Sequence, residues 1–302
     1  MSKPGRTTIT ASSQNTSKKT GTAKAPGNPF AVIAVVYLIC YAIRMFELLV
    51  LRTDQGVFGE AFIQKVAGII ILVMVAYLSG FKLRDIGFTR KHAIKGILLG
   101  LGLGLAVFTV AYGAEFILLL SQGQSPTFEF SVSAYALAGN VAGSTTAFTV
   151  ALCIVFNIIN VLMEEGLFRG LFTKLGMRRV SFMASNIIAS LLFGLWHIAL
   201  PIRSLIDGDM SAMGAFAAGS LYVSTSFLMG FLLGLLARMT GALWASMSMH
   251  FFNNTIINLL HITSLGGADE LQMLRLSISQ ALAFTAVLIA YIIWCRKQKR
   301  SD

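Results

Sequence analysis

The sequence predicts an all-α, polytopic membrane protein with about eight transmembrane helices. Of its 302 residues, 56% are hydrophobic and only 12% are charged. Apolar stretches of bilayer-crossing length recur from about Phe30 to Cys295, so we expect a single transmembrane helical domain over residues 29–296. The apolar runs do not alternate with polar residues, which argues against a transmembrane β-barrel.

About 20 apolar residues suffice for one helical crossing. The predicted crossings cover residues 30–51, 62–80, 94–120, 143–173, 181–200, 214–237, 241–262 and 276–295. In the third crossing Gly96, Gly100 and Gly104 share one helical face, and Gly230 and Gly234 share a face in the sixth. Small residues at this spacing favour close contact between membrane helices, so we expect these glycines to mark packing faces.

The formal net charge of +11 is concentrated at the ends of the apolar runs. Basic residues occupy the connections at 82–95, 174–179, Arg238 and 296–300, whereas the alternate connections contain most of the acidic residues. Because basic loops stay on the cytoplasmic side, both termini are predicted to be cytoplasmic. This distribution accounts for the charge without a nucleic-acid partner.

The two ends of the chain are predicted to be basic tails. Residues 1–28 are rich in Ser, Thr, Gly and Lys and contain no acid, which indicates a disordered cytoplasmic tail. They also lack the apolar stretch of a signal peptide, so the first crossing is expected to remain as an anchor. Residues 297–302 form a shorter basic tail. The three cysteines, Cys40, Cys153 and Cys295, show no metal-ligand spacing.

Ionisable side chains inside a bilayer are costly unless they are paired or face a cavity, so each is a functional candidate. Arg44 and Glu47, three residues apart in the first crossing, predict a local ion pair. Glu165 and Arg169, four apart in the fourth crossing, predict another. Glu164 points about 100° away from Glu165 and is therefore available as a general base.

Polar stripes accompany these charges. Asn160 and Asn157 share the face of Glu164, and the segment "FGLWH" places His197 on one face with Phe193, Ser190 and Asn186. A single histidine in an apolar helix is more often a packing residue than a catalytic one. The segment "HFFNN" places His250 and Asn254 together, with Asn258 and His261 continuing the face, and hydrogen bonds between helices would explain it equally well.

Depth in the bilayer indicates whether these stripes can meet. At 1.5 Å per residue, Glu164 lies roughly 18 Å from the nearest cytoplasmic turn, His197 roughly 24 Å and His250 roughly 14 Å. All three are therefore expected in the middle of the bilayer, where they could line one cavity.

Three motifs, in this order along the chain, resemble those of the CAAX-protease and bacteriocin-processing (CPBP) family, the Abi group of intramembrane endopeptidases. They are Glu164-Glu165-x-x-x-Arg169, Phe193-x-x-x-His197 and His250-x-x-x-Asn254. The resemblance covers about residues 143–262, and no motif position is substituted. It implies an endopeptidase that acts on a membrane-embedded, prenylated or leader peptide, with a catalytic core in these residues.

The resemblance also implies a role for each motif position. Glu164 would be the base that activates a water, with His197 as its partner, and His250 and Asn254 would stabilise the oxyanion. The supporting residues would be Glu165, Arg169 and Phe193. Glu164, His197 and His250 are also ligands of the type that catalytic zinc uses, so the residues themselves leave zinc open, whereas the resemblance favours a mechanism without a cofactor.

Two other classes of function compete with the protease. A transporter with an intramembrane proton or ion site would show internal repeats and paired broken helices, but no convincing repeat is present, and Pro201 is the only proline between Thr127 and Asp302. A catalytically silent scaffold of the same fold would keep the helices without the chemistry, and the intact motifs argue against it. The expected location is a prokaryotic plasma membrane, with peptide maturation or bacteriocin immunity as the expected process.

Overall fold

The computed structural model describes residues 27–56, 58–133, 145–264 and 267–301. Residues 1–26 of the predicted N-terminal tail and the first residues of the predicted fourth crossing lie outside this range. The helices are α1 (Pro29–Phe46) with a π-helical extension (Glu47–Leu51), α2 (Ile63–Leu78), α3 (Ala93–Ser121), α4 (Ala147–Glu164), a π-helical segment (Glu165–Phe172) that leads into α5 (Thr173–Gly176), α6 (Phe182–Trp196), α7 (Ala199–Asp207), α8 (Ala212–Thr240), α9 (Trp244–Leu259) and α10 (Gln272–Ser301).

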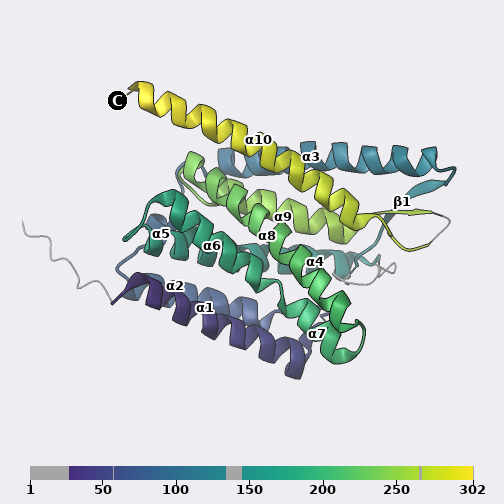
Figure 1. Ribbon diagram of the computed structural model, residues 1–302, viewed down its shortest axis with the longest axis horizontal. Helices are drawn as coiled ribbons and strands as arrows, with labels where there is room; N and C mark the ends of the chain where they lie inside the picture. Colours follow the sequence, from purple (N-terminus) through teal and green to yellow (C-terminus); the bar gives the residue numbers. More distant parts are fainter. Residues whose placement is uncertain (1–26, 57, 134–144, 265–266, 302) are drawn as a thin grey trace, which may run out of the picture.

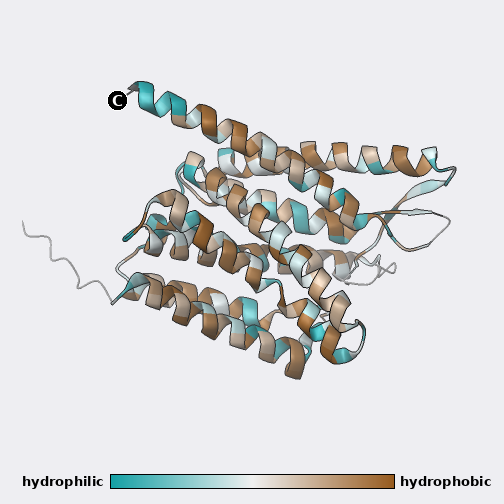
Figure 2. Ribbon diagram, viewed as in Figure 1, coloured by the Kyte–Doolittle hydropathy of each residue, from teal (hydrophilic) through white to brown (hydrophobic). Residues whose placement is uncertain are grey.

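The predicted fold class is confirmed. Six helical stretches in the described part of the chain are long and apolar enough to cross a membrane. The two shorter helices α2 and α9, of 16 residues each, occupy the positions of the second and seventh predicted crossings. Apolar residues cover most of the bundle, and hydrophilic ones gather at the end of α10, which continues as a helix through the predicted basic tail (Figure 2).

A pair of short antiparallel strands is the one departure from a purely helical fold among the described residues. Strands β1 (Pro126–Phe130) and β2 (Leu260–Ser264) are antiparallel and join the segment after α3 to the segment after α9. The prediction that His261 continues the helical face of His250 is therefore wrong, because α9 ends at Leu259.

His261 instead belongs to a buried polar cluster beside this strand pair. Its Nδ1 lies 3.2 Å from Asp269, and its Nε2 lies 3.0 Å from the carbonyl oxygen of Ser131. Burial raises the pKa of Asp269, but hydrogen bonds from His261 and Arg275 outweigh it and hold that pKa below its ordinary value. The cluster fastens the strand pair to the start of α10.

The beginning of α1 and the end of α10 lie at the same end of the bundle, which we call the terminal end (Figure 1). The turns after α2 and α5 meet there, because Arg178 donates to the carbonyl oxygen of Ser79 at 2.6 Å. The turn after α8 joins them through the indole of Trp244, which donates to the carbonyl oxygen of Thr89 at 2.5 Å. The basic connections thus gather at one end, as the charge pattern predicts.

At the opposite end, which we call the far end, two salt bridges join separate segments. Arg52, after α1, pairs with Asp207 at the end of α7 at 2.5 Å. Arg203 in α7 pairs with Asp54 in the α1–α2 connection at 2.6 Å. These pairs tie α7 to the loop that precedes α2.

The predicted ion pair between Arg44 and Glu47 is wrong. Glu47 accepts hydrogen bonds from the backbone N–H groups of Ile63 and Gln64, at 2.8 and 2.7 Å. These N–H groups open α2 and have no partners within their own helix, so Glu47 caps that helix. Arg44 lies instead over the ring of Trp196, 4.8 Å from its centre.

The predicted packing faces of the glycines are confirmed. On α3, a Cβ atom at Gly100 would lie 2.1 Å from Oγ of Ser248 and 2.2 Å from the carbonyl oxygen of Ala245, both on α9. On α8, a Cβ atom at Gly234 would lie 1.8 Å from Oδ1 of Asn186 on α6. Only glycine permits these helix separations.

We expect Gly100→Ala to lower the free energy of unfolding by roughly 1–3 kcal/mol, the usual cost of overpacking a tight contact. The control is Gly102→Ala, where the added Cβ would meet no side chain and no other helix within 4 Å. Thermal unfolding of both variants in detergent micelles measures the difference. Equal midpoints for Gly100→Ala and Gly102→Ala would contradict the contact.

Candidate active site

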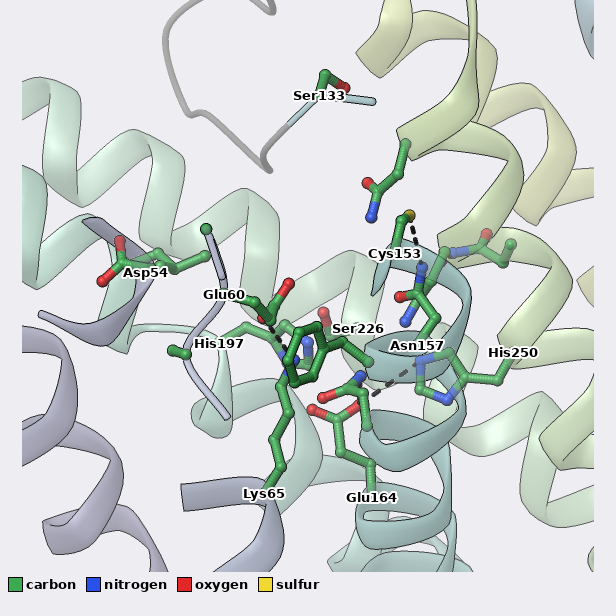
Figure 3. A pocket seen from close by; sticks show the side chains of 18 of the residues that line it. Asp54, Glu60, Lys65, Ser133, Cys153, Asn157, Glu164, His197, Ser226 and His250 are labelled. Carbon is green, nitrogen blue, oxygen red and sulfur yellow. Dashed lines mark hydrogen bonds and ion pairs between the residues drawn. The ribbon is translucent and has the colours of Figure 1, made fainter. Parts of the chain in front are cut away.

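A cavity of about 470 Å³ lies within the bundle and is lined by Glu164, His197, His250 and Asn254. These side chains come from the end of α4, the end of α6 and the middle of α9. Glu164, His197 and His250 face a common space in Figure 3. The structure therefore brings the four predicted catalytic residues to one cavity.

Glu164 is the last residue of α4, and its side chain is almost completely buried. Its Oε1 accepts a hydrogen bond from the indole nitrogen of Trp196 at 3.1 Å, and its Oε2 accepts one from the Asn160 amide at 3.2 Å. The same Oε2 lies 3.6 Å from Nε2 of His250. Donors from two helices thus fix a desolvated carboxylate against an imidazole.

Glu165 faces a different set of neighbours. Its Oε1 lies 3.3 Å from Nη1 of Arg169, so the predicted pair along the helix is present. The same oxygen lies 2.9 Å from Nδ1 of His250, a contact that the sequence did not predict. Because Glu165 engages Nδ1, the ring of His250 is oriented with Nε2 toward Glu164.

The backbone explains how adjacent glutamates reach different partners. From Glu165 to Phe172 the chain forms a π-helical segment with wider turns than an α-helix, an irregularity that often occurs at functional sites. Thr173 follows this turn geometry, since its hydroxyl donates to the carbonyl oxygen of Phe168, five residues earlier, at 2.8 Å. The expectation of a regular α-helix through these residues is therefore wrong.

His197 follows directly after α6, at the C-cap position. Its Nδ1 lies 2.8 Å from the carbonyl oxygen of Phe193, an acceptor, so Nδ1 carries the proton and Nε2 has a free lone pair. The ring of Phe193 stands edge-to-face against both imidazoles, with ring centres 4.8 Å from His197 and 5.8 Å from His250. Phe193 therefore fixes the positions of both rings.

Arg169 packs against Phe193 from the side of the π-helical segment. Its guanidinium lies over the ring of Phe193, 3.9 Å from the centre, and is almost fully buried. Within the described part of the chain its nitrogens make no hydrogen bond, so the ion pair with Glu165 and the cation–π contact are its compensation for burial.

Asn254 lies one turn beyond His250 on α9. Its Oδ1 accepts a hydrogen bond from the side chain of Asn253 at 3.1 Å. With the oxygen engaged, the amide NH₂ of Asn254 remains to donate within the cavity. An imidazole and an amide on the same helix face can therefore supply two donors to one bound oxygen.

Residues 146–256 match the family model described as type II CAAX prenyl endopeptidase, Rce1-like. The match contains all three motifs and runs from the start of α4 into α9. These residues are an Rce1-like segment. A comparison with curated proteins gives no match. The similarity to this family supports the interpretation of the chain as a CAAX-type protease that lies in a lipid bilayer and acts on a membrane-associated substrate.

Two residues around the Rce1-like motifs were missed from the sequence. Trp196 stands between the motif positions Phe193 and His197 and binds Glu164 directly. Arg44 from α1, outside the Rce1-like segment, lines the cavity beside it. The indole next to a motif histidine could have pointed to Trp196. Arg44 was noticed as a charge inside the bilayer but was assigned to a pair with Glu47.

The predicted polar stripe on α6 does not reach the cavity as a whole. Asn186 donates to the carbonyl oxygen of Phe231 on α8 at 3.0 Å, and Ser190 donates to the carbonyl oxygen of Asn186 at 2.6 Å. Both residues serve the packing of α6 against α8, and His197 and Phe193 alone of this stripe line the cavity.

Zinc binding by Glu164, His197 and His250 stays a prediction from the residue types. Among the residues that the structure describes, no three His, Cys, Asp or Glu side chains are arranged to hold one metal ion. Nδ1 of His197 is directed at a carbonyl oxygen and Nδ1 of His250 at Glu165, which leaves Nε2 of each ring for the cavity, as in histidines that bind a metal and in those that bind a water.

Proposed function

We propose that the protein is an intramembrane endopeptidase that hydrolyses a peptide bond of a membrane-associated or lipidated polypeptide. The observation that supports this most is the buried carboxylate of Glu164, held by Trp196 and Asn160, at a cavity that it shares with two imidazoles. We place the protein in a prokaryotic plasma membrane, where leader peptides and lipidated tails are available as substrates.

The proposed reaction begins with a water between Glu164 and His197. Glu164 takes a proton as the water oxygen bonds to the carbonyl carbon of the substrate. Nε2 of His197 accepts a hydrogen bond from the same water and directs its lone pair. The carbonyl oxygen becomes an oxyanion, and the side chains of His250 and Asn254 donate to it.

The tetrahedral intermediate then collapses, and the carbon–nitrogen bond breaks. Glu164 returns its proton to the departing amine, which regenerates the carboxylate and releases an acid and an amine. In this scheme Glu165 is a positioning residue, because it touches His250 and not the reacting atoms.

The test is cleavage by the purified protein in liposomes. We expect hydrolysis of a farnesylated C-terminal peptide or of a leader peptide, with the cleaved bond identified by mass spectrometry and activity retained in a chelator. His92→Asn should leave cleavage unchanged, because His92 is exposed, lies outside the cavity and has a backbone φ of 58° that asparagine tolerates.

Two results would refute the proposal that the protein is a protease. Solute or proton flux without cleavage would establish the transporter, and neither flux nor cleavage with a stable fold would establish the scaffold. Loss of cleavage in a chelator, restored by zinc, would refute the metal-free mechanism alone.

A further inference from the structure

The cavity reaches the surface at the far end of the bundle. Apart from the deep residues already described, its lining comes from the α1–α2 connection, from Val132 and Ser133 after β1, from the first turns of α4 and from the start of α10. In Figure 3, Asp54, Glu60 and Ser133 lie on the side of the cavity away from Glu164. Gly56 and Phe58, which also line it, are exposed.

The terminal end contributes nothing to this opening in the described ranges. None of the lining residues comes from the connections after α2, α5 or α8, which carry the contacts of Arg178 and Trp244 described above. Glu164 closes the cavity on that side, and the next residues toward the terminal end, from Glu165 to Phe172, are buried.

The two ends differ sharply in charge. The chain has 24 Lys and Arg residues. All lie in the N-terminal segment or at the terminal end except Arg44, Arg52, Lys65, Arg169, Arg203 and Arg275. Short loops rich in Lys and Arg remain in the cytoplasm. The terminal end is therefore the cytoplasmic one.

The bases at the far end are matched by acids. Arg52 pairs with Asp207 and Arg203 with Asp54, as described above. At the mouth of the cavity, Nζ of Lys65 lies 2.5 Å from Glu60. Whatever these pairs contribute, the far end holds few Lys and Arg residues, and it is their number that would hold a loop in the cytoplasm.

We infer that the cavity opens on the non-cytoplasmic face of the membrane and receives a polypeptide that has already been translocated. The orientation of the cavity is inferred from its lining residues and from the uneven distribution of Lys and Arg between the two ends. The statement about a substrate rests on the proposed function. The reaction that supplies this substrate is then an export step, and the cleavage follows it.

The depth of Glu164 sets a minimum length for such a substrate. Helix α4 begins at the far end and reaches Glu164 after 18 residues, which is about 27 Å of helix. An extended chain advances about 3.3 Å per residue, so roughly eight unfolded residues are needed to reach the carboxylate. The substrate is thus a flexible segment or tail, because a folded domain could not enter.

Labelling of introduced cysteines tests the orientation. Cys40, Cys153 and Cys295 are first replaced by serine, and Gly56→Cys at the mouth or Lys91→Cys at the exposed terminal end is then introduced. A membrane-impermeant maleimide is applied to bacterial cells with a permeabilised outer membrane. We expect Gly56→Cys to react fully before lysis of the inner membrane, and Lys91→Cys only after it.

Any other labelling pattern overturns the inference. Reaction of Lys91→Cys before lysis, or of Gly56→Cys only after it, would place the mouth in the cytoplasm. A membrane-permeant maleimide confirms that both thiols are reactive in the folded protein. Since labelling requires no hydrolysis, a chain that labels as expected but cleaves no peptide leaves the orientation intact and refutes the protease.

Discussion

Glu164→Gln is expected to reduce the rate of peptide cleavage roughly 10²–10⁴-fold, the usual contribution of a general base, while the protein remains folded. Glutamine has nearly the same volume, and its oxygen can still accept the hydrogen bond from Trp196. It cannot take the proton of the attacking water. The measurement is single-turnover cleavage in liposomes, with thermal unfolding in detergent to establish that the fold is retained.

The matched control for this substitution is Glu270→Gln, which removes a carboxylate from an exposed position before α10 and should leave the rate unchanged. Asn254→Ala should lower the rate less than Glu164→Gln does, because it removes one of two oxyanion donors and leaves the base in place. Cleavage by Glu164→Gln at the wild-type rate would end the assignment of Glu164 as the base.

The second large effect is expected for Arg169→Leu, which should lower the free energy of unfolding by about 3–5 kcal/mol. The side chains of Arg169 and Glu165 are only 2% and 0% exposed, so the substitution leaves the carboxylate of Glu165 without its arginine partner where water is scarce. Cleavage should be lost as well, because Glu165 would no longer be held against His250. Thermal unfolding and the cleavage assay measure the two effects.

A double variant separates charge burial from catalysis. Glu165→Leu/Arg169→Leu removes both members of the pair and should be more stable than Arg169→Leu, because no buried charge is left without a partner. It should remain inactive, since His250 loses the carboxylate that orients it. A single Arg169→Leu variant as stable as the wild type would show that the pair contributes nothing to the fold.

The fold was largely predictable because bilayer-crossing helices are determined by length and hydropathy, which are properties of the local sequence. The helix-packing glycines were predictable for the same reason, since their spacing along one helix defines a face. The end of α9 was not: the pairing of Leu260–Ser264 with Pro126–Phe130 replaces the last helical turn by a strand, and the partner is more than 100 residues away in the chain.

Within the site, contacts along one helix were predictable and contacts between helices were not. The pairs Glu165–Arg169 and Asn160–Glu164 follow from a spacing of four residues. The contact between His250 and Glu165 depends on the relative height and rotation of α4 and α9, which one sequence does not encode in any local pattern. The partner of Arg44 was predicted wrongly for the same reason, because its neighbour Trp196 lies on another helix, α6.

The wide turns from Glu165 to Phe172 have a consequence for how the protein can be altered. Ordinary helical winding is usually preferred, so this segment must be kept open by what surrounds it. A Cβ atom at Gly166 would lie 2.4 Å from the side chain of Leu72, and one at Gly170 would lie 2.9 Å from the carbonyl oxygen of Ile86. Laboratory evolution of new specificity should therefore accept changes at the rim of the cavity far more readily than changes in this remote scaffold behind the carboxylates.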